Sequence, residues 1–283
     1  MRKQWTSGVA QQWPIFIPPT RPSLSELAKI EKHLLALKKH SADFKMLILG
    51  STPEYRDLGL TYNVDYVCAD YNEENFRALG TQMHHRDSEN CLVQVDWRRM
   101  NFDEEFNLIL GDLATTVTPV KDHDLLLQTI AQSLKKNGLC ILKTALRKNN
   151  KRMSHQDIFK LYQKERSYLN PFGAVWFEVM LADYDFKEDT MSCVKSYEEL
   201  KKSFKRKIIT KYEFEAFAQH WLSLGDFKMN IPLRTAFLAK ARKYFTIAVD
   251  SGEDWYKEDI SLLILKRKKL KPSPELKHSI KPY

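Results

Sequence analysis

Apolar positions along the chain fall into two patterns, short continuous runs and longer segments with helical spacing. The short runs predict five buried strands in the first half of the chain, at 46–49, 64–70, 91–97, 106–112 and 139–146. Helical spacing predicts helices between them. One begins near Glu54, a second covers 72–80 with Asn72 as N-cap and Gly80 as its stop, and a third covers 123–138 and ends at Gly138. Strands that alternate with helices indicate an α/β fold with a parallel sheet and helices on both faces.

The pattern changes after residue 150. Residues 151–228 have helical spacing and many aromatic side chains, with Ser154 as an N-cap and Gly225 at the end of the last helix. Two strands then follow, at 243–252 and 260–268, joined by a short charged link. This arrangement predicts a helical insertion and a closing antiparallel hairpin.

Composition limits the classes of protein that the chain can represent. With 283 residues and 43% apolar content, it can bury the core of one large domain or of a domain with an inserted subdomain. No apolar stretch of membrane-spanning length and no secretory signal is apparent, and the four cysteines are widely spaced without a C-x-x-C motif. We therefore expect a cytoplasmic protein with free thiols, three of them in core strands.

The net charge of +9 is concentrated at one end of the chain. Residues 266–283 hold seven Lys or Arg against the single acid Glu275, which accounts for +6 of the total. A basic tail at 269–283 that contains proline is typical of a flexible, solvated end, although it would also attract phosphates without specificity. Charge alone therefore does not identify a nucleic-acid-binding protein.

Polar residues stand where four predicted strands end. The first strand leads into the turn Gly50-Ser-Thr-Pro-Glu54, and the others end at Asp70-Tyr71, Asp96-Trp97 and Gly111-Asp112. In an open α/β sheet, ligands bind at the carboxyl ends of the strands. An acid about 20 residues after the first turn is suited to the two hydroxyls of a ribose. Asp96 is suited to an adenine amine, and Trp97 to a face or edge of the base.

The first turn argues against a phosphate ligand. Phosphates require a glycine-rich nest and a nearby cation, whereas this turn has one glycine, no lysine and the carboxylate of Glu54. The G-x-G-x-x-G of a nicotinamide-dinucleotide domain is also absent. A cationic adenosine derivative without phosphates, S-adenosylmethionine, fits this chemistry.

With these residues in view, the sequence resembles the class I S-adenosylmethionine-dependent methyltransferases, particularly bacterial members whose first motif reads G-x-T-P-E. The matching segments are "LILGSTPEYRDL", "VDYVCADYN", "CLVQVDW", "NLILGD" and the terminal hairpin. The resemblance implies a Rossmann-like, seven-stranded, mostly parallel sheet with an antiparallel terminal hairpin and a helical insertion between strands 5 and 6. It implies S-adenosyl-L-methionine as cofactor, bound by Gly50, Ser51, Thr52, Pro53, Glu54, Asp70, Tyr71, Asp96, Trp97, Gly111, Asp112 and Leu113.

The resemblance also suggests how the chain is divided. Residues 1–43 would form an N-terminal lid segment and helix, in which Trp13 and Arg21 are candidate substrate contacts. Residues 44–150 and 229–268 would form the cofactor-binding domain, and the aromatic insertion at 151–228 would select the methyl acceptor. Asp112 and Tyr71 are candidates for a catalytic base.

Three functions remain open from the sequence. The first is methyl transfer to a small or medium organic molecule, the second is cofactor binding without transfer and with a protein partner, and the third is RNA methylation. Two short motifs carry less weight. "HHRD" at 84–87 lacks a complete set of metal ligands, and "NPFG" at 170–173 is typical of a helix start.

Overall fold

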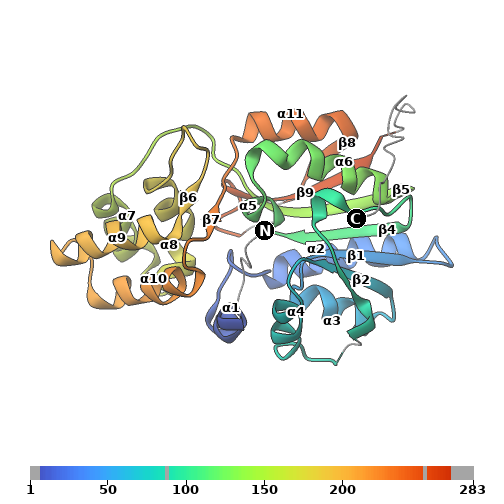
Figure 1. Cartoon of the computed structure of the whole chain (residues 1–283), viewed down its shortest axis with the longest axis horizontal. Helices are drawn as coiled ribbons and strands as arrows, with labels where there is room; N and C mark the ends of the chain where they lie inside the picture. Colours follow the sequence, from blue (N-terminus) through green and yellow to red (C-terminus); the bar gives the residue numbers. More distant parts are fainter. Residues whose placement is uncertain (1–6, 87–88, 251–253, 269–283) are drawn as a thin grey trace, which may run out of the picture.

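The computed structural model describes residues 7–86, 89–250 and 254–268. Figure 1 shows two groups of elements side by side, a twisted sheet covered by helices and a smaller group of helices formed by residues 155–229 (the lobe). The predicted basic tail at 269–283 lies outside the described residues.

The larger group is built on a seven-stranded sheet in the order β3-β2-β1-β4-β5-β9-β8. Neighbouring strands from β3 to β5 pair in parallel, whereas β9 is antiparallel to both β5 and β8. The strands are β1 (Lys45–Leu49), β2 (Asp65–Asp70), β3 (Leu92–Gln94), β4 (Phe106–Asp112), β5 (Leu134–Ala145), β8 (Phe245–Val249) and β9 (Ile260–Arg267). The predicted α/β class, the mostly parallel sheet and the terminal hairpin are therefore confirmed.

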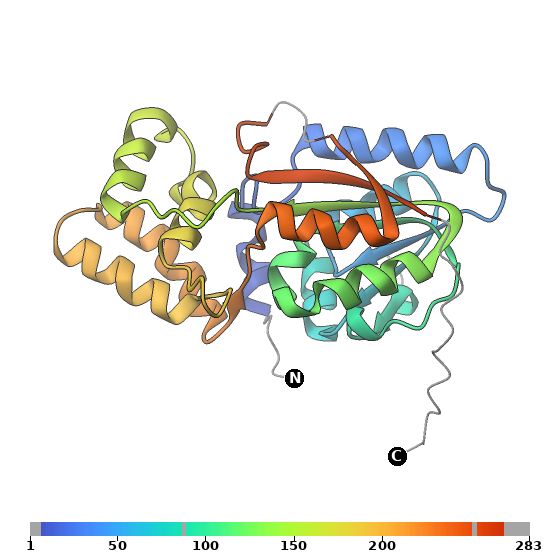
Figure 2. The same ribbon diagram turned by 90° about the horizontal axis from the view of Figure 1, so that it is seen from above.

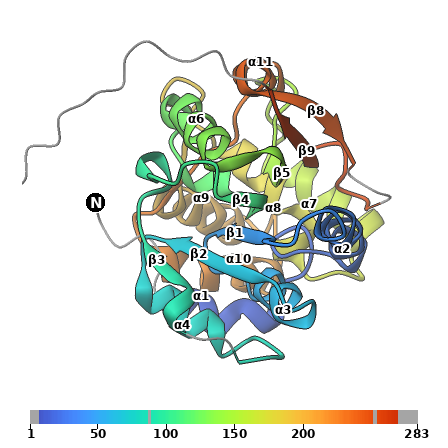
Figure 3. The same cartoon turned by 90° about the vertical axis from the view of Figure 1, so that its right-hand side faces the viewer.

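Helices cover both faces of this sheet (Figure 3). One face packs against α2 (Leu24–Lys38), α3 (Pro53–Thr61) and α4 (Glu73–Gly80). The other packs against α6 (His123–Ser133) and α11 (Arg234–Tyr244). Four of the five residues of β1 are buried, as expected for a central strand covered on both sides.

Local sequence explains where these helices begin. Ser23 and Glu26 form a reciprocal capping box at the start of α2, with the Ser23 hydroxyl accepting from the Glu26 amide at 3.0 Å. The Asn72 side chain accepts from two backbone amides in the first turn of α4, which confirms the predicted N-cap.

Several predicted boundaries were wrong. The third strand is confined to Leu92–Gln94, because Cys91 belongs to a 3₁₀ turn and Asp96 caps another, η3 (Trp97–Arg99). The helix expected to reach Gly138 ends at Ser133, and the following residues already belong to β5. A Cβ on Gly138 would lie 2.9 Å from the Phe106 carbonyl, so this glycine serves strand packing and not helix termination. The helix α11 was not anticipated.

Figure 2 shows the lobe as a separate group of helices beside the sheet, and the core of this lobe is rich in aromatic side chains. Its elements are α7 (His155–Leu161), the π-helical turn η5 (Tyr162–Arg166), α8 (Pro171–Ala182), α9 (Cys193–Lys205) and α10 (Lys211–Leu224), with two-residue strands β6 (Met191–Ser192) and β7 (Lys228–Met229). Ser154 caps α7 and Gly225 ends α10 with φ +58°, both as predicted. Asn170 of "NPFG" caps α8, so that motif is a helix start.

The remaining described features concern the N-terminus and the cysteines. Residues 7–23 (the strap) contain α1 (Ser7–Gln12) and η1 (Trp13–Ile15), and α1 contacts both α4 and α10. All four cysteines are free; Cys68 and Cys140 are buried in strands, as predicted, whereas Cys91 is not in a strand. Within the described ranges, no helix combines the length and apolar character that a bilayer crossing requires.

Candidate functional site

A cavity of about 300 Å³ lies at the carboxyl ends of the central strands, between the sheet, the strap and the lobe. It has the size of a small-molecule site. The predicted residues that line it are Gly50, Ser51, Thr52, Asp70, Tyr71, Asp96, Trp97, Asp112, Leu113 and Trp13. Pro53, Glu54, Gly111 and Arg21 are not part of this lining.

The turn after β1 depends on the backbone conformation of Gly50. Its φ is +98°, which L-residues with a side chain rarely adopt, and its amide donates to the Ala69 carbonyl at 2.8 Å. A Cβ at Gly50 would meet only the Trp97 ring, at 3.6 Å, so dihedral angle and not lack of space requires glycine. Pro53 then occupies the first turn of α3.

Asp70 ends β2 as a buried, well-oriented carboxylate. It accepts hydrogen bonds from the Ser51 hydroxyl at 2.5 Å, the Asn72 amide at 2.9 Å and the Asn75 side-chain amide at 3.3 Å. Burial raises the pKa of this carboxyl, against the opposing effect of those donors. Asp70 is thus held in a fixed orientation at the cavity wall, where it can accept further hydrogen bonds from a ligand.

In the structure, Asp96 already forms an ion pair, which the sequence did not indicate. The Arg98 guanidinium binds its carboxylate with two nitrogens, at 2.9 and 2.6 Å, and also reaches Asp122 at 2.5 Å. The hydrogen bonds from Arg98 hold the pKa of Asp96 below its ordinary value. The indole nitrogen of Trp97 donates to the Ala69 carbonyl at 2.5 Å, which fixes the ring beside the turn after β1. An adenine amine would therefore meet a carboxylate that is already paired.

Glu54 lies beneath the strap, next to the cavity. Its Oε1 accepts from the Trp13 indole at 3.1 Å and from the Arg21 guanidinium at 2.5 Å. Its Oε2 is buried without a hydrogen-bond partner. The two predicted substrate contacts, Trp13 and Arg21, thus share one partner in this structure, the first carboxylate of α3.

A buried group of charges lies under the carboxyl ends of β4 and β5. Lys143, with a side chain 0% exposed, is 3.1 Å from Glu26 and 3.4 Å from Asp112, and it donates to the Arg21 carbonyl at 2.7 Å. Burial raises the pKa of Asp112 to about 7; Lys143 opposes this effect, whereas Glu26 and Glu54 add to it. Sequence reasoning missed Lys143 and Glu26, although a lysine within an apolar strand was a signal.

The residues flanking Asp112 have different roles. A Cβ at Gly111 would lie 2.7 Å from the Leu142 side chain, so this glycine allows β4 and β5 to pack and does not face the cavity. Leu113 lines the cavity in a left-handed conformation, with φ +53°. Such conformations are costly for a branched side chain and are concentrated at functional sites.

The lobe supplies the apolar wall of the cavity through Phe172 and Trp176 of α8 and His220 of α10. Both aromatic residues belong to the predicted insertion at 151–228. His220 was missed, because a single histidine in an amphipathic helix has no distinguishing pattern.

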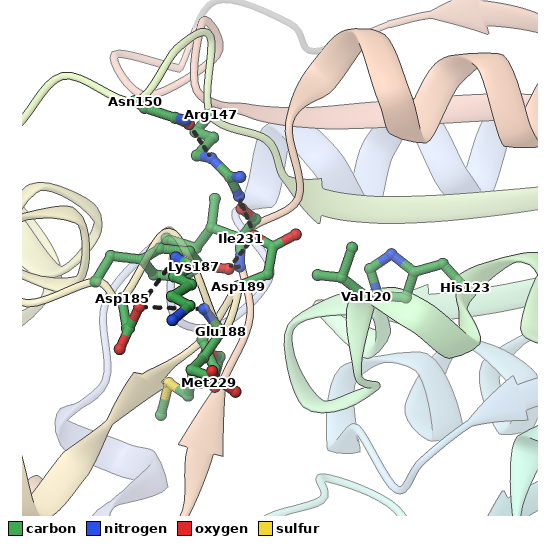
Figure 4. A network of polar contacts seen from close by, with 12 residues as sticks. Val120, His123, Arg147, Asn150, Asp185, Lys187, Glu188, Asp189, Met229 and Ile231 are labelled. Carbon is green, nitrogen blue, oxygen red and sulfur yellow. Dashed lines mark hydrogen bonds and ion pairs between the residues drawn. The ribbon is translucent and has the colours of Figure 1, made fainter.

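The two chain segments that connect the lobe to the sheet are held together by Arg147 (Figure 4). Its guanidinium lies 2.7 Å from Asp189, donates to the Ile231 carbonyl, and donates to the side-chain oxygen of Asn150 at 3.1 Å. Tyr184 donates to Asp189 at 3.1 Å and accepts from the Ile231 amide at 3.0 Å. This polar group fixes the position of the lobe relative to the end of β5.

Comparisons with known proteins bear on the fold. No family model and no curated protein matches the sequence. A Rhodobacter sphaeroides structure, provisionally described as a Zn-dependent alcohol dehydrogenase, matches with a TM-score of 0.55 at 12% identity, covering 94% of this chain and 100% of that one. A S-adenosylmethionine-dependent methyltransferase from Methanosarcina mazei matches with a TM-score of 0.46 at 14% identity, covering 83% of this chain and 98% of that one.

A third match is an N-methyltransferase from Haemonchus contortus in complex with S-adenosylhomocysteine, with a TM-score of 0.41 at 15% identity, covering 94% of this chain and 59% of that one. Of these three matches, the first exceeds a TM-score of 0.5, and at 12% identity it supports the α/β fold alone, so function has to be argued from the chemistry of the site. Within the described part of the chain, no group of three His, Cys, Asp or Glu residues is arranged to hold a metal ion.

Proposed function

We propose that the cavity binds S-adenosyl-L-methionine and that the protein transfers its methyl group to a small or medium organic acceptor. The observation that carries the proposal is the charge around the cavity. Three carboxylates, Glu26, Glu54 and Asp112, are grouped with two cations, Lys143 and Arg21.

With Asp112 ionised, this group holds more negative than positive charge, and its acceptor atoms are incompletely satisfied. The Oε2 of Glu54 is buried without a hydrogen-bond partner, and the buried Oδ1 of Asp112 has only the ion-pair contact with Lys143 at 3.4 Å. Because buried polar atoms are normally satisfied, these oxygens suit a ligand that brings a positive charge or N–H donors. The α-ammonium and sulfonium of S-adenosylmethionine provide that chemistry.

The rest of the lining is consistent with an adenosine that carries no phosphate. Arg98 is the only Lys or Arg among the lining residues in the described ranges, and it is paired with Asp96 and Asp122. A phosphate would therefore meet aspartates without a cation to neutralise it. Asp70 would accept from the ribose hydroxyls, and Trp97 with Tyr71 would border the base.

When bound, S-adenosylmethionine supplies an activated methyl group on a sulfonium. The chain's own contribution is to hold that ligand at the strand ends, to exclude water with the strap and the lobe, and to position the acceptor. In this division, residues 44–150 with 229–268 bind the cofactor, residues 151–228 select the acceptor, and the strap within 1–43 acts as a lid. Asp112 is a candidate base, because a pKa of about 7 allows it to take and release protons near neutrality.

Isothermal titration calorimetry tests the cofactor. S-adenosylmethionine and S-adenosylhomocysteine should bind, and Asp70→Ala should weaken both at least tenfold, because charge-assisted hydrogen bonds contribute about 1.5–3 kcal/mol each. The matched control is Asp65→Ala, since Asp65 is exposed at the opposite end of the same strand. Binding of NADH or ATP in preference to S-adenosylhomocysteine would overturn the assignment.

A transfer screen with labelled cofactor against metabolite pools and RNA tests the reaction, using the full chain and a chain that ends at residue 268, beyond the last strand. Transfer to a small molecule by both forms is expected. Transfer to RNA that is lost with the basic end would favour an RNA methyltransferase. Tight cofactor binding without any transfer, together with a recovered protein partner, would favour a binding protein.

A further inference from the structure

The two sides of the cavity differ in charge. The sheet side contributes Asp70, Asp96, Arg98 and Asp112. The lobe side contributes aromatic and aliphatic side chains, and its one titratable group among the described lining residues is His220. The hydroxyl of Ser223, also on this side, donates to the His220 carbonyl at 2.8 Å and is therefore occupied.

The surrounding hydrogen bonds determine which nitrogen of His220 carries the proton. The side-chain amide of Gln12 donates to the Gln219 carbonyl at 3.2 Å, which turns its oxygen toward the Nδ1 of His220. Because an amide oxygen only accepts, Nδ1 must be the protonated nitrogen and Nε2 must carry the lone pair. Burial lowers the pKa of His220 to about 4, so the imidazole is neutral at physiological pH.

The ring of His220 is held rigidly. Its centroid lies 3.9 Å from that of Phe172 and 4.9 Å from that of Phe16. The side chain as a whole is 4% exposed. Nε2 has no hydrogen-bond partner among the described residues, and it is not completely buried. His220 is among the residues that line the cavity, and we assign the accessible lone pair to that space.

We infer that the lobe side of the cavity is the subsite for the methyl acceptor, and that it takes a flat, uncharged aromatic molecule whose hydroxyl or N–H donates to Nε2 of His220. The walls formed by Phe16, Phe172 and Trp176 favour an aromatic ring. A charged group would lose its hydration here without a partner of opposite sign. A molecule without a donor would leave Nε2 unsatisfied after water is displaced. Naming this ligand the methyl acceptor rests on the proposed function, whereas the subsite itself is argued from geometry.

The test uses the full chain and three probes that share one ring system: 2-naphthol, 2-methoxynaphthalene and 2-naphthoate. Binding is measured by calorimetry, and the imidazole nitrogens are followed by ¹⁵N NMR of histidine-labelled protein. We expect 2-naphthol to bind at least tenfold more tightly than the other two and to shift the Nε2 resonance of His220. Equal binding of the ether or of the carboxylate would overturn the inference.

Two variants separate the hydrogen bond from the packing. His220→Phe should bind 2-naphthol and 2-methoxynaphthalene equally, and the exposed His40→Phe serves as the control that keeps the preference. If circular dichroism shows that His220→Phe does not fold, the variant Gln12→Leu replaces it as the test of the hydrogen bond. It removes the oxygen that fixes the tautomer and should reduce the preference for 2-naphthol. A preference that survives in a folded variant would refute the role of His220.

Titration of S-adenosylhomocysteine into the same samples distinguishes this inference from the proposed function. Intact S-adenosylhomocysteine binding without selectivity among the naphthalenes would overturn the inference and leave the cofactor assignment standing. Selectivity for 2-naphthol without S-adenosylhomocysteine binding would overturn the cofactor assignment and support an aromatic subsite.

Discussion

The substitution Asp112→Asn should change how the stability of the protein depends on pH. Asparagine has nearly the same shape as aspartate but cannot ionise, so it removes the titration of this side chain with little effect on packing. Lys143 keeps two other partners in the variant, Glu26 at 3.1 Å and the Arg21 carbonyl at 2.7 Å.

The direction and size of the effect follow from the raised pKa. In the folded protein the pKa of Asp112 is about 7, compared with 3.8 for an ordinary aspartate. Between these values the folded state binds more protons than the unfolded state, so the contribution of Asp112 is fully present below about pH 4 and is lost as pH rises toward 7. A difference of about 3 in pKa corresponds to about 4 kcal/mol, at 1.36 kcal/mol per unit.

Urea unfolding followed by tryptophan fluorescence, at half-unit steps from pH 4 to pH 8, measures this contribution. The free energy of unfolding of Asp112→Asn minus that of the parent protein should rise by up to about 4 kcal/mol across this interval. Taking the difference cancels titrating groups that do not interact with Asp112, including His220. The control Asp103→Asn changes an exposed aspartate in the loop before β4 and should give a difference that does not vary with pH. A flat difference for Asp112→Asn as well would refute the raised pKa.

Three further substitutions test the local geometry by chemical denaturation. Gly50→Ala should lower the free energy of unfolding by about 1–2 kcal/mol, because φ is +98° there; an unchanged value would contradict this conformation. Trp97→Phe removes the donor to the Ala69 carbonyl and should cost about 1 kcal/mol; equal stability would show that this bond is replaced by water. Arg147→Met removes the cation beside Asp189 and the donor to the Ile231 carbonyl, leaving Asp189 with the Tyr184 hydroxyl, and should cost about 2 kcal/mol; Lys148→Met at an exposed position should be neutral, and equal losses for the two variants would contradict this role of Arg147.

The sheet was predictable because its central strands are buried on both faces. Such strands read as continuous apolar runs, and the alternation of runs with capped helices determines the parallel arrangement. Boundaries were less accurate where the competing signals were weak. Lys135, Lys136 and Gly138 resemble a helix end, yet backbone pairing with β4 extends β5 to Leu134, where Leu134 pairs with Phe106.

The sheet side of the cavity was partly predictable because the strands are parallel. Residues that follow parallel strands must meet at one edge of the sheet, so Asp70, Asp96 and Asp112 could be placed together from their positions alone. The ion-pair partners of these aspartates could not be predicted in this way. Arg98 pairs with Asp96 across only two residues, but Lys143 and Glu26 meet from elements 117 positions apart, which no local pattern encodes.

The lobe side was less accessible to prediction because it is assembled from three separate segments. Phe172 of α8 and His220 of α10 stack within the lobe, whereas Gln12 reaches His220 from the strap, 208 positions away in the sequence. The same strap also carries Trp13 and Arg21, which bind Glu54 next to the sheet side of the cavity. One short segment therefore sets both the tautomer of the lobe histidine and the neutralisation of the first carboxylate of α3. If the strap moved away, Glu54 would lose its cation and His220 its fixed proton together, so the strap links the sheet side of the cavity to its lobe side.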